Sequence, residues 1–152
     1  MDDTDVKLLN LLAADADVTA TALAPALNLS VPAINKRIAR LRSAGVIRQY
    51  TVLLDGEKVG KPIQAFVLLV LEKFARSEAL MELVRGDPDV LDCHAVTGEY
   101  DYILHICARD IGELEKKLLT LKSRCGLAKS YTLLSLMEHK HQATPLPDET
   151  KE

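Results

Sequence analysis

The sequence predicts an α+β protein with two domains, a helical one at the N-terminus and a second in which strands and helices alternate. Two observations carry this prediction. Apolar residues recur at helical spacing up to Gly45, whereas strand-like and helical periods alternate after Pro62. The segment between them carries two glycines, a proline and several charges, as is typical of a linker. We therefore expect a helical domain over residues 1–50, a strand and linker over 51–62, an α/β-alternating domain over 63–137 and a disordered tail over 138–152.

The first helix is expected over residues 2–14. Its apolar residues fall on one stripe at helical spacing, and they are Leu8, Leu9 and Leu12. Acidic residues gather at its N-terminal end, where the helix dipole favours negative charge, and they are Asp2, Asp3 and Asp5. Together with Val18, the leucine stripe can form the core of a three-helix unit.

A second, shorter helix is expected over residues 19–27. Pro25 lies well inside it if Thr19 is the N-cap, and a proline there removes a backbone hydrogen bond at a cost of about 3 kcal/mol. The alternative is a helix that starts late, with Thr21 as its cap. We expect a short or distorted helix, followed by a tight turn at Asn28.

The third predicted helix is strongly basic. The segment from Ser30 to Gln49 contains five basic residues and neither Asp nor Glu, in a chain whose formal net charge is -3. The five are Lys36, Arg37, Arg40, Arg42 and Arg48. Ser30 is a good N-cap and Gly45 can end the helix in a left-handed conformation. Such a local surplus of positive charge in an acidic protein indicates an anionic partner.

The third helix is also amphipathic. Ile34, Ile38 and Leu41 form one apolar stripe, while Lys36 and Arg40 project to the opposite side. Helix, turn and basic helix form the layout of a helix-turn-helix, whose second helix enters the major groove of duplex DNA. The alternative is a solvated basic helix in a small bundle. The expected DNA contacts are Ser30, Asn35, Lys36, Arg37 and Arg40, with Arg42 and Arg48 on the flanking DNA backbone.

The remaining elements are predicted from changes of period along the chain. After the winged-helix-like, three-helix unit, a strand is expected over residues 46–53. In the second domain, strands are expected over residues 64–71, 90–97, 102–108 and 128–136, and helices over 77–85 and 111–123. The order βαββαβ is the ferredoxin-like plan, with both helices on one face of an antiparallel sheet. Because the strands are apolar enough for both faces, we expect a homo-oligomer.

Cysteine usage and hydropathy exclude several classes of protein. The three cysteines, Cys93, Cys107 and Cys125, show no C-x-x-C spacing, so we expect neither a disulfide framework nor a structural zinc site. No secretory signal is visible, and the longest apolar run, residues 65–71, is too short to span a bilayer. We expect a cytoplasmic protein that does not contact a membrane.

No pattern favours an enzyme. Cys93 and His94 are adjacent in a predicted strand, so their side chains point to opposite faces and cannot act as nucleophile and base. The His/Cys pair at 105–107 and the His pair at 139–141 lack the further ligands that a metal site needs. Phosphate-loop, dinucleotide and nucleophile-elbow motifs do not occur, and 4% aromatic residues provide no stacking platform for single-stranded RNA. We expect no catalysis, no cofactor and no metal.

Two sets of motifs, in the right order, resemble those of a known family. The N-terminal set reads Asp5-x-x-Leu8-Leu9-x-x-Leu12 and Leu29-Ser30, followed by Arg37-Ile38-x-x-Leu41-x-x-Ala44-Gly45-Val46-Ile47-x-x-Tyr50. The second set reads Cys93-His94-x-Val96-Thr97-Gly98-Glu99-Tyr100-Asp101-Tyr102. From about Asp3 to Glu138 the chain resembles the leucine-responsive regulator (Lrp)/AsnC family of bacterial and archaeal transcription factors, the feast/famine regulators.

The resemblance implies a second site. Members of the family pair through the βαββαβ unit into dimers, often assemble further into tetramers or octamers, and bind amino acids in clefts between subunits. It implies here that the amides of Thr97, Gly98 and Glu99 receive a carboxylate and that Asp101 holds an ammonium group. Side chains implied to wall the site or to offer hydroxyls are Tyr100, Tyr102, Ser130 and Thr132. By pattern alone, Gly-x-x-Asp between two strands is also what a hairpin turn uses.

The expected function is therefore a sequence-specific, double-stranded DNA-binding transcription regulator whose DNA binding or assembly responds to a small amino-acid effector bound between subunits. One alternative is a DNA-architectural protein without an effector, which would respond to no amino acid. The other is an amino-acid-sensing module that regulates an enzyme in trans, which would not retain DNA.

Overall fold

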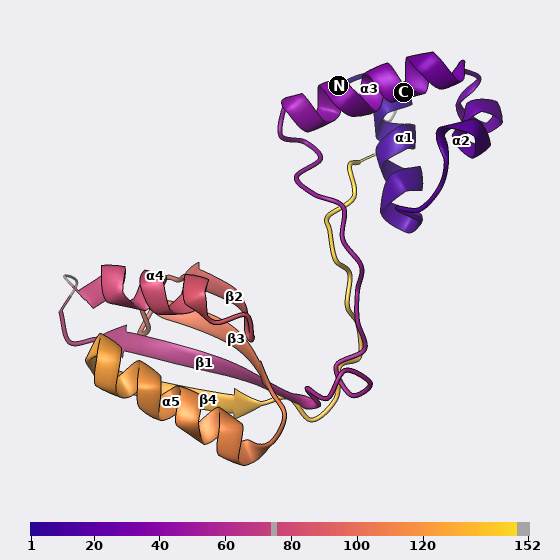
Figure 1. Cartoon of the computed structure of the whole chain (residues 1–152). Coiled ribbons are helices and arrows are strands. Elements are labelled where there is room, and N and C mark those ends of the chain that lie inside the picture. Colours follow the sequence, from indigo (N-terminus) through magenta and orange to yellow (C-terminus); the bar gives the residue numbers. More distant parts are fainter. Residues whose placement is uncertain (74–75, 149–152) are drawn as a thin grey trace. The chain divides into compact units, whose positions relative to one another are not determined.

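The computed structural model describes residues 1–73 and 76–148, and the chain divides into two compact units. Residues 1–53 group with residues 140–148 in the first unit, and residues 54–139 form the second (Figure 1). Residues 135–148 form neither helix nor strand. The tail expected beyond residue 137 is therefore irregular over its described part, and its disorder stays a prediction.

Three helices build the first unit. They are α1 (Asp3–Ala14), α2 (Ala20–Leu27) and α3 (Val31–Ser43). Their apolar stripes meet in one core, whose buried members are Leu8, Leu12, Leu23, Ile34 and Leu41. A turn at Asn28, with a φ of 50°, joins α2 to α3. The helix-turn-helix expected from periodicity is confirmed.

The side chains in front of these helices cap them. Asp2 accepts a hydrogen bond from the backbone N–H of Asp5 at 2.8 Å, and Thr19 accepts one from Ala22 at 3.2 Å. Helix α2 therefore begins directly after Thr19, and the alternative late start at Thr21 is wrong. The expectation of a short helix holds, because α2 has eight residues and contains Pro25.

Helix α3 has the predicted ends, but the strand expected after it does not form. Ser30 caps its N-terminus through a 3.4 Å hydrogen bond from Ala33, and Gly45 has a φ of 72° just beyond its end. Residues 46–53 carry no strand, so the prediction over this range is wrong. A strand needs a partner for its backbone hydrogen bonds, and the described part of this unit contains no other strand.

The second unit is a four-stranded antiparallel sheet with two helices. The elements are β1 (Ile63–Leu71), α4 (Ser77–Gly86), β2 (Val90–Ala95), β3 (Tyr102–Ala108), α5 (Ile111–Cys125) and β4 (Leu127–Leu134). The strand order is β2-β3-β1-β4, and β1 pairs with both β3 and β4 (Figure 1). The order βαββαβ and the ferredoxin-like plan are confirmed.

The two faces of this sheet differ. Alternate residues of β1, Ala65, Val67 and Leu69, are fully buried in a core shared with Leu80 of α4 and Leu121 of α5, so both helices cover one face. The other face carries side chains that alternate with these, and no described element of this unit covers it. We call it the open sheet face and define it by Phe66, Leu68, Ile103, His105, Tyr131 and Leu133, which are cross-strand neighbours.

The described helices are too short or too polar for a membrane span. Not one of those in residues 1–73 and 76–148 is long and apolar enough to cross a bilayer.

Candidate nucleic-acid interface and effector loop

The solvent side of α3 presents polar and basic side chains. Asn35, Lys36, Arg40 and Arg42 are exposed, while Ile34 on the opposite side is fully buried. The ammonium group of Lys36 has no polar partner within the described part of the chain. An unpaired cation on a rigid helix can accept a phosphate without first breaking an internal bond.

Two arginines of α3 are bound to the N-terminus of α1. The guanidinium of Arg37 lies 2.7 Å from the carboxylate of Asp2 and 2.8 Å from that of Asp5. The guanidinium of Arg40 lies 2.6 Å from Asp5. Asp5 is 1% exposed, so its charge is buried and satisfied by both arginines. We call these four residues the α1–α3 ion-pair cluster.

The cluster shifts the acidities of its members. Hydrogen bonds from Arg37 hold the pKa of the Asp2 carboxyl below its ordinary value. Burial works to raise the pKa of Asp5, but the hydrogen bonds from Arg37 and from the Asp2 backbone outweigh it, and that pKa is lowered. The same carboxylates raise the pKa of Arg37. Asp2, Asp5 and Arg37 are therefore charged at neutral pH. The cluster pairs two arginines with two carboxylates, so its formal charges cancel.

The remaining predicted DNA contacts lie near the two ends of α3. The hydroxyl of Ser30 accepts the capping hydrogen bond of α3. The guanidinium of Arg42 lies 5.8 Å from the ring centroid of Tyr50, which orients it by a cation–π contact. Arg48 is exposed beyond Gly45. The structure thus places four predicted contacts on one solvent-exposed helix, and they are Asn35, Lys36, Arg40 and Arg42. The sequence did not indicate that Arg37 and Arg40 pair with α1.

The predicted effector loop is the turn between β2 and β3. Its ends are joined by a hydrogen bond from the backbone N–H of Val96 to the carbonyl of Asp101 at 2.9 Å. Gly98 has a φ of 108°, which a residue with a side chain rarely adopts. Thr97, Gly98 and Glu99 are exposed, so their backbone is accessible to a ligand. The hairpin-turn interpretation and an exposed anion-binding turn are both compatible with this geometry.

Asp101 fastens this turn to the end of β1. Its carboxylate accepts a hydrogen bond from the backbone N–H of Leu71 at 2.9 Å, and its own N–H donates to the carbonyl of Leu69 at 2.8 Å. A carboxylate has about four acceptor positions, so Asp101 keeps acceptors for an ammonium group. In this chain the residue therefore already has a structural partner in addition to its predicted role.

Strand β4 places one basic side chain, that of Lys129, beside the turn. The ammonium group of Lys129 lies 4.6 Å from the ring centroid of Tyr100 and 3.5 Å from a carboxylate oxygen of Glu99. Ser130 is the cross-strand partner of Leu69, whose other partner is Tyr102, so it lies on the helix-covered face, opposite to Lys129, the partner of Val70. Thr132 pairs with Val67, one step further from the turn. Nothing in the sequence indicated Lys129, because only the pairing of β4 with β1 brings it to the turn.

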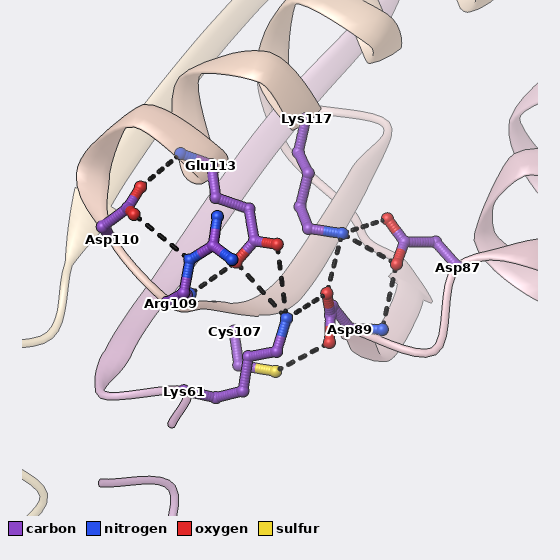
Figure 2. A network of polar contacts seen from close by, with 8 residues as sticks. All are labelled: Lys61, Asp87, Asp89, Cys107, Arg109, Asp110, Glu113 and Lys117. Carbon is purple, nitrogen blue, oxygen red and sulfur yellow. Dashed lines mark hydrogen bonds and ion pairs between the residues drawn. The ribbon is translucent and has the colours of Figure 1, made fainter. Parts of the chain in front are cut away.

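A second polar cluster lies at the opposite end of β1 (Figure 2). The ammonium group of Lys61 lies 2.8 Å from Asp89 and 3.3 Å from Glu113. Lys117 lies 2.6 Å from Asp87 and 3.0 Å from Asp89. The hydrogen bond from Lys61 lowers the pKa of Asp89. The cluster ties the segment before β1 to the helix layer, and its lysines and carboxylates are paired with one another.

The described side chains do not form a metal site. Within residues 1–73 and 76–148, His, Cys, Asp and Glu side chains do not gather in threes in an arrangement that could hold an ion. Cys93, Cys107 and Cys125 are free thiols. Burial raises the pKa of each of these thiols, which makes them poor nucleophiles at neutral pH.

Two family models match the chain, one in each unit. A model described as winged helix-turn-helix DNA-binding matches residues 1–48. A model described as Lrp/AsnC ligand binding domain matches residues 64–145, which is more than half of the chain. The first match contains α1 to α3, and the second contains both helices and all of the sheet except Ile63.

Known regulators are similar to the chain along almost all of its length. The HTH-type transcriptional regulator FL11 of Pyrococcus furiosus is 31% identical, over 97% of this chain and 96% of its own. The glutamate uptake regulatory protein of Zymomonas mobilis is 32% identical, over 97% of this chain and 92% of its own.

Solved structures show the same similarity. A transcriptional regulator of Neisseria meningitidis in complex with L-Met has a TM-score of 0.90 at 34% identity, covering 96% of this chain and 97% of its own. A feast or famine regulatory protein of Mycobacterium tuberculosis complexed with L-methionine has a TM-score of 0.86 at 27% identity, covering 96% and 99% of the two chains.

Proposed function

The chain belongs to the Lrp/AsnC family of DNA-binding transcription regulators, and from this premise we propose that it binds double-stranded DNA sequence-specifically and that an amino acid bound between subunits changes its DNA binding or assembly. The observation that supports the DNA-binding half is the exposed, basic side of α3 opposite a fully buried Ile34. Neither family model describes a catalytic domain, and we propose that the chain is not an enzyme.

Helix α3 is proposed to enter the major groove. Asn35 can donate to and accept from an adenine edge, whereas Lys36 and Arg42 neutralise phosphates. In a dimer, two copies of α3 would contact successive half-sites about one helical turn apart, which makes the target site roughly palindromic. The positive charge needed for this is local, since the whole chain carries a net charge of -3.

The DNA-binding proposal is tested by removing the unpaired cation of α3. Lys36→Ala should weaken binding to a mixed-sequence duplex and make the slope of log K against log salt shallower by about 0.9, the loss of one phosphate contact. Lys7→Ala is the matched control, because Lys7 is an exposed lysine on α1 of the same unit. Equal affinities and slopes for the two variants would refute the assignment of α3 to the groove.

The effector half of the proposal rests on the turn between β2 and β3. A free amino acid carries a carboxylate and an ammonium on one carbon, so it needs clustered N–H donors beside a negative charge. The exposed amides of Thr97, Gly98 and Glu99 supply donors, and Asp101 supplies the charge. That two structurally similar regulators were solved with methionine supports this class of ligand.

An amino-acid screen tests the effector half. At a hundred times its dissociation constant, a ligand that binds only the folded state stabilises it by about 2.7 kcal/mol, which a thermal-shift assay detects. Asp101→Asn should abolish the response, whereas Asp92→Asn, an exposed aspartate of neighbouring strand β2, should not. No shift with any of the twenty amino acids would favour the DNA-architectural alternative, and no DNA retention would favour regulation of an enzyme in trans.

The open sheet face supports the proposed assembly. Phe66, Tyr131 and Leu133 are 37%, 55% and 45% exposed in the single chain, and they are neighbours across the strands β1 and β4. An apolar patch of this kind on a sheet fits a second copy of the same face. We propose a dimer through this face, with a tetramer or octamer as the larger assembly, and a cytoplasmic location where its DNA is found.

A further inference from the structure

The α1–α3 ion-pair cluster lies on one flank of the helix that is proposed to enter DNA. At about 100° per residue, Arg37 and Arg40 project between the buried stripe of α3 and its exposed ridge at Lys36. The side chain of Asp2 is 52% exposed, so its carboxylate is open to solvent on the same flank. Asp5 differs, because it is 1% exposed and its buried carboxylate forms ion pairs with both guanidinium groups.

The charges on this flank cancel. Arg37 and Arg40 face the carboxylates of Asp2 and Asp5 within 2.9 Å, and two positive groups meet two negative ones. In the described part of the chain, the other basic residues of the segment have no carboxylate partner, and they are Lys36, Arg42 and Arg48. A phosphate that approaches Arg37 must therefore replace Asp2 or lie beside its negative charge.

We propose that the negative charge of Asp2 weakens DNA binding. Its carboxylate occupies one nitrogen of Arg37 and repels the DNA backbone, so the protein binds DNA less tightly, and with a shallower salt dependence, than the basic residues of α3 alone would allow. The inference rests on the proposed DNA binding. Asp5 anchors the two arginines to α1, whereas the exposed Asp2 is the carboxylate that a phosphate can replace.

The test is Asp2→Asn, which removes the charge and keeps the cap. Asparagine caps a helix as well as aspartate does, so its side-chain oxygen can still accept the hydrogen bond from the N–H of Asp5. Affinity for a mixed-sequence duplex is measured by fluorescence anisotropy over a series of salt concentrations. We expect binding about threefold tighter, the effect of one unit charge roughly 6 Å away in water. The slope of log K against log salt should steepen by about 0.9 if Arg37 gains one phosphate.

Two variants separate this effect from a general change of charge. Asp17→Asn makes the same charge change beyond the other end of α1, about 18 Å along the helix axis and beyond the Debye length of about 8 Å at physiological salt. It should leave affinity and slope unchanged. The double variant Asp2→Asn/Arg37→Gln removes the pair and keeps the flank neutral, so it should return to wild-type affinity and slope.

The outcomes are distinct. Tighter binding and a steeper slope for Asp2→Asn alone support the proposal. Affinity and slope equal to those of Asp17→Asn, or weaker binding, overturn it. If Asp2→Asn lowers the unfolding temperature, Asp2→Ser, which also caps, must show the same gain or the proposal fails. A wild-type protein that binds no DNA would instead overturn the proposed function itself.

Discussion

Phe66→Ala should disrupt the self-association that we propose for the open sheet face. In the single chain the ring of Phe66 stacks on the imidazole of His105, with centroids 4.6 Å apart, and Leu133 is its partner on β4. The phenylalanine is nevertheless 37% exposed. A two-fold partner would cover this remaining surface, so truncating the side chain removes apolar contact from the interface and little from the core of the single chain.

The expected magnitude follows from that exposed fraction. A phenylalanine side chain has about 200 Å² of surface, so Phe66 exposes about 70 Å², worth about 1.8 kcal/mol at 25 cal/mol/Å². A two-fold interface contains two copies, so the dimer loses about 3.5 kcal/mol. This raises the dissociation constant of the dimer roughly 400-fold.

Sedimentation equilibrium of the full chain over a dilution series measures this constant. Leu119→Ala is the matched control, because Leu119 is 59% exposed on α5 and α5 covers the other face of the sheet. It should leave the dissociation constant unchanged. Wild-type protein that is monomeric at micromolar concentration, or an equal loss of association in both variants, would refute the assignment of the dimer to this face.

Two further predictions concern stability. Ile34→Ala should destabilise the first unit by about 2–5 kcal/mol in urea unfolding, because Ile34 is fully buried in the three-helix core and its truncation leaves a cavity. Acid should destabilise the second unit. The hydrogen bond from Lys61 lowers the pKa of Asp89, and hydrogen bonds from the Arg109 backbone and then from Lys61 lower that of Glu113. Their contribution to stability is therefore complete above about pH 5 and is lost as the pH falls through the lower folded-state values. The free energy of unfolding, measured from pH 7 to 3, should therefore fall less steeply in Lys61→Met, which lacks the shared partner of both carboxylates, and an unchanged slope would contradict this.

Local sequence determined what could be predicted of α3. Its buried stripe at Ile34 and Leu41, its cap at Ser30 and the left-handed Gly45 are all encoded within a few residues of where they act. The helix accordingly runs from Val31 to Ser43, inside the predicted segment. The same holds for the second unit, where strand and helix periods alternate and each element was predicted to within two residues at either end.

What could not be predicted depends on partners distant in sequence. Residues 46–53 have the composition of a strand, but the sequence does not say that the first unit offers no strand to pair with. Asp2 and Arg37 are 35 residues apart, and no periodic pattern connects them. Lys129 reaches the turn at Tyr100 only because β1 lies between β3 and β4. Such contacts follow from topology, which local propensity does not determine.

The neutral flank of α3 has a consequence for specificity under the proposed function. Phosphate contacts raise affinity for every DNA sequence alike, whereas contacts to base edges distinguish one sequence from another. Asp2 and Asp5 cancel the charges of Arg37 and Arg40, which lowers the sequence-independent part of the binding free energy. The base contacts of α3 then make up a larger share of the total binding free energy. An amino acid that couples to DNA binding by about 1–3 kcal/mol then changes occupancy of the target site more effectively, because less of the protein is held by competing DNA.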